Sequence, residues 1–171
     1  CNNGLFSNKI TTSLPDNKNA VVVFDTEQSK YDAYVTANRI KRMLGYIPEN
    51  YAAYGLRELS PIERCEIIDF AFEKLGHLIS FAVIDGIADL AKAINDEEEA
   101  TRVIGLLMKW TSIYNCHIVT VIHQNKNDNF ATGHIGSAIL KKAENIISAT
   151  KHDQYKNKSI ISCDNMRGGS E

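Results

Sequence analysis

Three apolar stretches of the sequence stop at residues that can hold a metal ion, activate water or contact a phosphate. A strand buried on both faces has no place for an unpaired carboxylate, so each such residue should lie where its strand ends. If the three strands are parallel, these ends meet at one edge of the sheet, where open α/β sheets bind ligands. The residues concerned are Asp85 after 81–84, Asp25 and Glu27 after 20–24, and His123 and Gln124 after 117–122.

Together, these residue types suit metal-assisted hydrolysis. One acid can hold Mg²⁺, another can orient water, and a neutral donor can contact a phosphate. Each strand end also has a simpler interpretation. Asp85 fits the cap of the next helix, and Glu27 fits the first turn of the helix that follows it. His123 and Gln124 fit loop residues that bond to nearby backbone.

The elements that must position these side chains are strands that alternate with helices. Helix boundaries are marked by Ser29 and Gly45 for one helix, and by a Ser60 cap with Glu63 and a Gly76 stop for the next. The alternation predicts an α/β fold with a mostly parallel sheet, and the last two strands predict an antiparallel extension. The predicted strands are 20–24, 54–59, 81–85, 117–122, 145–150 and 159–163; the predicted helices are 30–44, 61–75, one opened by the acidic run 95–99, and 137–144.

Composition indicates a single globular domain. The chain has 171 residues, of which 44% are hydrophobic and 23% charged, and its net charge is −2. No apolar run is long enough to span a bilayer, no signal peptide is visible, and three of the four scattered cysteines lie in apolar stretches that fit buried thiols, so we expect a cytoplasmic protein with no membrane partner. The charge excludes a broad basic surface, so any nucleic acid must be bound by local loops or by a ring of subunits. Within this domain we expect a loop or the tail of a helix at residues 1–19, the core at 20–163 and a flexible tail at 164–171.

Four segments carry a resemblance to a known family. Residues 21–27, 82–85, 119–124 and 136–144, in this order and spacing, resemble the RecA-like ATPase core. The resemblance covers residues 20–168 and is greatest to RepA-type plasmid helicases, DnaB-like replicative helicases and mobilisation proteins of bacterial mobile elements. It implies a parallel sheet with helices on both faces, with ATP and Mg²⁺ as cofactors of the complete protein.

The resemblance also implies roles for individual residues. Glu27 would activate the attacking water, Asp85 would be the Walker B acid that holds Mg²⁺ through water, and Gln124 with His123 would sense the γ-phosphate. The loop from Asn125 to His134, with Lys126, would face single-stranded DNA. Arg167 would reach the nucleotide of a neighbouring subunit in a homo-oligomer such as a hexameric ring.

One family motif is not found in the sequence. No G-x-x-x-x-G-K-[ST] occurs, and the chain starts at Cys1 rather than Met, so we expect a fragment that follows the first strand and phosphate loop. The fragment should then neither bind ATP tightly nor hydrolyse it, because the amides and lysine that hold the phosphates are absent. The strand before that loop normally lies between strands 117–122 and 145–150, so we expect two unpaired strand edges there. The alternatives are a catalytically silent binding or assembly module and a RadA-like or KaiC-like regulatory ATPase.

Overall fold

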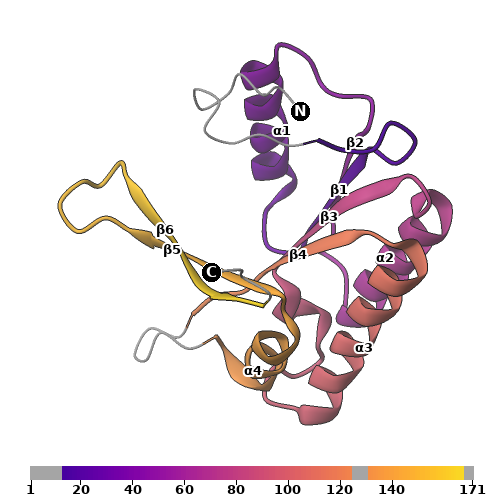
Figure 1. Cartoon of the computed structure of the whole chain (residues 1–171), viewed down its shortest axis with the longest axis vertical. Helices are drawn as coiled ribbons and strands as arrows, with labels where there is room; N and C mark the ends of the chain where they lie inside the picture. Colours follow the sequence, from indigo (N-terminus) through magenta and orange to yellow (C-terminus); the bar gives the residue numbers. More distant parts are fainter. Residues whose placement is uncertain (1–12, 125–130, 168–171) are drawn as a thin grey trace.

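The computed structural model describes residues 13–124 and 131–167 (Figure 1). Its main sheet has four parallel strands in the order β2-β1-β3-β4, and a separate antiparallel pair joins β5 to β6. The strands are β1 (Ala20–Asp25), β2 (Tyr51–Gly55), β3 (Ile79–Asp85), β4 (His117–Val121), β5 (Asn145–Lys151) and β6 (Ser159–Met166). The helices are α1 (Lys30–Leu44), α2 (Pro61–Leu75), α3 (Glu97–Tyr114), α4 (Gly133–Lys142) and a short 3₁₀ helix, η2 (Ile87–Leu90).

The core lies between the sheet and the helix pair α2 and α3. Alternate residues of β1, Val22 and Phe24, are fully buried on this face, as strand geometry requires. The ring of Phe72 on α2 lies 6.1 Å from Phe24 and stacks on Trp110 of α3 at 5.3 Å. This aromatic layer fixes the helices against the sheet. Figure 1 shows α1 on the other side of the sheet from α2 and α3, so helices flank the sheet as predicted.

The predicted helix boundaries of α1 and α2 are confirmed by their caps. Ser29 accepts from the backbone N–H of Asp32, and Gly45 ends α1 in the left-handed region at φ 83°. Ser60 and Glu63 form the reciprocal capping box at the start of α2. These local signals therefore fix where the chain re-enters the sheet after each helix.

The predicted boundaries of three other elements are wrong. The strand predicted at 54–59 lies at 51–55, because Leu59 N–H bonds back to Leu56 O and turns the chain there. Helix α4 begins at Gly133 rather than at 137. Strand β6 continues to Met166, so residues 164–166 of the predicted tail belong to a strand, in which Asn165 and Met166 pair with β5. The predicted loop is irregular over the described residues 13–19, and residues 1–12 and 168–171 lie outside the described part of the chain.

Strand β4 is at the edge of the parallel sheet. Among residues 13–124 and 131–167, β3 is the only strand that pairs with it, and β5 pairs with β6 alone. The strands at 117–122 and 145–150 therefore each have an edge that no described strand covers, as expected from the sequence. No helix within the described ranges is both long enough and apolar enough to cross a bilayer.

Candidate functional site

The carboxyl ends of β1 and β3 lie side by side. Asp25 and Asp85 are register partners across this strand pair, and Asp85 is in turn the partner of Val121 at the end of β4. Because the strands are parallel, the residues that follow them meet at the same edge of the sheet. Glu27, Asp85 and His123, although far apart in the sequence, are thereby brought to one edge.

Glu27 and His123 are in direct contact. The Nε2 atom of His123 lies 3.1 Å from Oε2 of Glu27, and the two side chains are 76% and 37% exposed, respectively. Gln124 is the next residue; it is exposed, and its backbone forms an isolated antiparallel bridge to Ala131. The contact joins the end of β1 to the end of β4 across β3, while both side chains remain accessible to a ligand.

Asp85 is in an electronegative environment. Partial burial raises the pKa of its carboxyl group, the nearby charges of Asp25 and Glu27 raise it further, and His123 acts in the opposite direction. Concentrated negative charge with oxygen donors is the chemistry that a hard divalent cation such as Mg²⁺ prefers. The donor set thus fits Mg²⁺ beside Asp85.

The described residues offer only a partial coordination shell. Within 13–124 and 131–167, no group of three His, Cys, Asp or Glu residues is placed to hold a metal ion. Magnesium sites of nucleotide enzymes use one or two carboxylates, with waters and phosphate oxygens completing the shell. Asp85 with bound water fits that arrangement, whereas an all-protein metal cage does not.

Asp25 shapes the turn that carries Glu27. This residue is 8% exposed, and its Oδ1 accepts from the backbone N–H groups of Glu27 and Gln28 at 3.0 and 2.8 Å. An aspartate that bonds two following amides is an Asx-type turn. Asp25 therefore directs the chain after β1 and leaves Glu27 as the accessible carboxylate.

Gly86 allows the two strand ends to approach closely. It has φ +86°, and a Cβ atom there would lie 2.2 Å from Thr26 Oγ1 and 2.9 Å from Glu27 Cγ. Only glycine combines this backbone conformation with this contact. The sequence pattern indicates no role for Thr26 or Gly86; the position of a glycine directly after Asp85 is the available signal.

Two other predicted site residues, His134 and Arg167, lie on or near α4. His134 is exposed in the first turn of α4, where its N–H donates to Ile94 O. Arg167 donates from its backbone to Glu144 O at 2.7 Å and from its guanidinium to Lys141 O, so it lies at the C-terminal end of α4. Asn125 and Lys126 fall outside the described residues.

The sheet order, the flanking helices, the antiparallel pair and the edge that gathers Glu27 and Asp85 define a RecA-like α/β core. Among solved structures, the chain is similar to the crystal structure of the RadB recombinase, with a TM-score of 0.59 and 12% sequence identity, over 90% of this chain and 72% of that one. At this identity the likeness shows the fold alone, a RecA-like α/β core. No protein-family model and no curated protein matches the chain.

Proposed function

We propose that the chain is part of a RecA-like ATPase that couples ATP hydrolysis to work on DNA, as a replicative helicase or a mobilisation protein of a mobile element. The proposal is carried by one observation: Glu27, Asp85 and His123 lie together at the carboxyl edge of a parallel sheet, where Glu27 and His123 are hydrogen-bonded. The RecA-like fold and the similarity to a recombinase support it.

Each residue has a distinct task in this proposal. Glu27 accepts a proton from the attacking water, for which its accessible carboxylate is suited. Asp85 would hold a hydrated Mg²⁺, which would neutralise charge on the phosphates. His123 and Gln124 follow β4 and contact the γ-phosphate. His123 also holds the Glu27 carboxylate, so that one side chain connects the base with the phosphate contact.

The DNA partner and the assembly belong to the same proposal. Asn125, Lys126 and His134 contact single-stranded DNA, and Arg167 serves the nucleotide of a neighbouring subunit in a homo-oligomeric ring. Lysine and histidine contacts to phosphates make binding depend strongly on salt. Binding of a labelled oligonucleotide should therefore weaken with rising salt, and more steeply for wild type than for Lys126→Gln. An identical salt slope for the two proteins would remove Lys126 from the DNA site.

The central test is hydrolysis by the complete polypeptide that carries this chain. We expect DNA-stimulated phosphate release, and we expect Glu27→Gln to lower the rate about 10²- to 10⁴-fold, the range for removal of a general base. The matched control is Glu73→Gln, which makes the same chemical change on the exposed surface of α2. Equal rates for Glu27→Gln and wild type would exclude Glu27 as the base.

A silent binding or assembly module is the second candidate. It is favoured by one observation: these 171 residues contain no G-x-x-x-x-G-K-[ST] motif. This candidate predicts that the complete polypeptide releases no phosphate from ATP above the uncatalysed rate. A thermal-shift measurement on this chain adds a second check, because strong stabilisation by Mg-ATP would contradict our expectation that the chain alone binds ATP weakly.

A further inference from the structure

A buried threonine connects the ends of β1 and β3. Thr26 is 2% exposed, and its backbone N–H donates to Asp85 O at 3.1 Å. Its hydroxyl oxygen lies 2.8 Å from Asp89 Oδ2, 2.9 Å from Asp85 O and 3.1 Å from Gly86 O. A hydroxyl has one proton, and of these three acceptors the carboxylate forms the strongest bond. The Thr26 hydroxyl therefore bonds principally to Asp89 and lies close to the carbonyls of the last residue of β3 and of Gly86.

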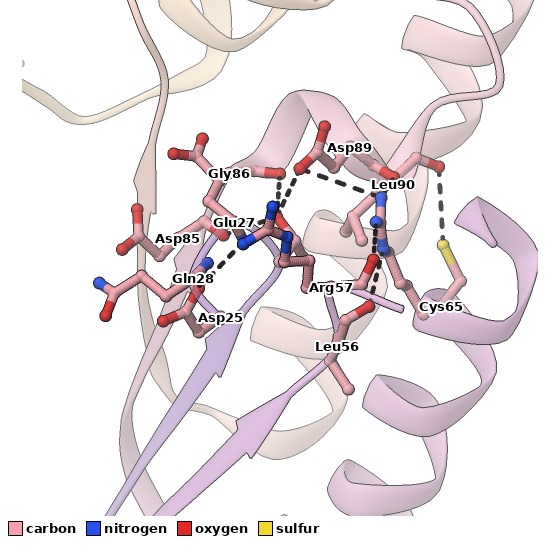
Figure 2. A network of polar contacts seen from close by, with 12 residues as sticks. Asp25, Glu27, Gln28, Leu56, Arg57, Cys65, Asp85, Gly86, Asp89 and Leu90 are labelled. Carbon is pink, nitrogen blue, oxygen red and sulfur yellow. Dashed lines mark hydrogen bonds and ion pairs between the residues drawn. The ribbon is translucent and has the colours of Figure 1, made fainter. Parts of the chain in front are cut away.

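Arg64 on α2 supports Asp89 from the other side. Its side chain is 13% exposed, and Nη1 lies 3.9 Å from Asp89 Oδ2. The same guanidinium donates to the backbone carbonyls of Asp89, Leu56 and Arg57, at 2.8, 3.1 and 2.9 Å. Leu56 N–H in turn donates to Asp25 O at 2.7 Å. The contacts close a ring around the carboxyl end of β1, whose labelled members can be followed in Figure 2.

The ring determines where Glu27 can lie. Glu27 is bonded covalently to Thr26, and its Cγ packs so closely on Gly86 that a single added methyl group there would lie 2.9 Å from it. Gly86 is itself contacted by the Thr26 hydroxyl. A displacement of Thr26 would therefore move Glu27 relative to Asp85, because Thr26 precedes Glu27 in the chain and bonds to Asp85 O.

We propose that Thr26, Asp89 and Arg64 are positioning residues that fix the separation of Glu27 from Asp85. The inference rests on the ATPase site proposed above, and assigns to these three side chains a task that needs no contact with the nucleotide. A purely structural role would affect only the free energy of unfolding. A positioning role lowers the rate at which a folded, nucleotide-saturated molecule turns over, because displacement of a reacting group by about 1 Å can cost about 10²-fold in rate.

The first test compares hydroxyl variants in the complete polypeptide. Thr26→Val preserves shape and charge and removes the hydroxyl; we expect kcat to fall about 10- to 100-fold with KM for ATP unchanged. Thr26→Ser restores the hydroxyl and should recover most of the rate. The matched control is Thr111→Val, because the Thr111 hydroxyl donates to Leu107 O inside α3, within its own helix. Equal kcat values for Thr26→Val and Thr111→Val would overturn the proposal.

The second test needs no hydrolysis. Amide hydrogen exchange on this chain reports the bond from the residue 26 N–H to Asp85 O directly. We expect exchange at residue 26 to be about tenfold faster in Thr26→Val, the effect of weakening about one hydrogen bond. The Ile84 amide and the urea midpoint of unfolding should change much less. Unchanged protection of residue 26 would refute the positioning role.

The two tests separate the inference from the proposed function. A wild-type polypeptide that hydrolyses no ATP refutes the ATPase, and the exchange result then decides whether Thr26 still holds the two strand ends together. If the wild type is active and Thr26→Val changes neither kcat nor the exchange rate at residue 26, the positioning role is refuted and the proposed ATPase is not. Faster exchange, reduced kcat and rescue by serine support both.

Discussion

Replacement of Gly86 by alanine should destabilise the protein for two separable reasons. The residue has φ +86°, and the left-handed conformation costs a residue with a Cβ about 1–2 kcal/mol. The new methyl group would also lie 2.2 Å from Thr26 Oγ1, in a buried contact between two strand ends. Overpacking of this kind costs about 1–3 kcal/mol, so the total expected loss is about 2–5 kcal/mol.

Two other glycines of the chain isolate these contributions. Gly45 has φ +83° with nothing within 4 Å of an added Cβ, so Gly45→Ala should cost only the conformational part, about 1–2 kcal/mol. Gly105, inside α3, has neither a positive φ nor a neighbour within 4 Å. Gly105→Ala should therefore stabilise the protein by about 0.5–1 kcal/mol, through the better helix propensity of alanine.

Urea unfolding followed by circular dichroism measures all three substitutions under identical conditions. The expected order of stability is Gly105→Ala above wild type, then Gly45→Ala, then Gly86→Ala. If Gly86→Ala loses no more than Gly45→Ala, the close packing of Thr26 and Glu27 on Gly86 is refuted. The structural basis of the positioning role would then be lost as well.

Two further predictions concern local electrostatics and capping. A hydrogen bond from Arg102 and another from Lys92 N–H lower the pKa of Glu99 from 4.5 to about 2. The charged form is thus favoured on folding, so Glu99→Gln should be less stable than wild type above about pH 4.5. The deficit should fade as the pH decreases to about 2, and a deficit in urea midpoint that does not vary with pH would contradict this. Ser60→Ala removes the hydroxyl of the α2 capping box and should cost about 1 kcal/mol in urea unfolding, whereas the exposed Ser112→Ala should cost almost nothing; equal losses would contradict the cap.

Much of the fold could be predicted because its signals are local. The apolar runs ending in Asp25 and Asp85, and the caps at Ser29 and Ser60, each occupy a few consecutive residues. Alternation of strands with helices then makes the sheet parallel and brings the strand ends to one edge. The placement of Glu27 beside the β3 end follows from this reasoning without any knowledge of tertiary contacts.

The errors arose where a local pattern was overruled by a neighbouring element. Residues 54–59 have apolar positions suited to a strand, yet Leu56 is buried in a turn. The N–H of Leu56 donates to Asp25 O, and its carbonyl accepts from Arg64. Helix α4 starts earlier than its apolar pattern indicates, because the N–H of His134 donates to Ile94 O in the loop before α3. Each correction depends on a partner distant in the sequence.

The same reason explains why the ring around β1 could not be predicted. Thr26 and Asp89 are 63 residues apart, and Arg64 and Asp89 are 25 apart. A threonine after a strand, or an arginine in the first turns of a helix, is unremarkable by itself, because its importance lies in the acceptor it meets. The glycine after Asp85 was the one local sign of a close approach. A candidate carboxylate such as Glu27 can be found from the end of its own strand, whereas the side chains proposed to position it become visible only when three separate segments are brought together.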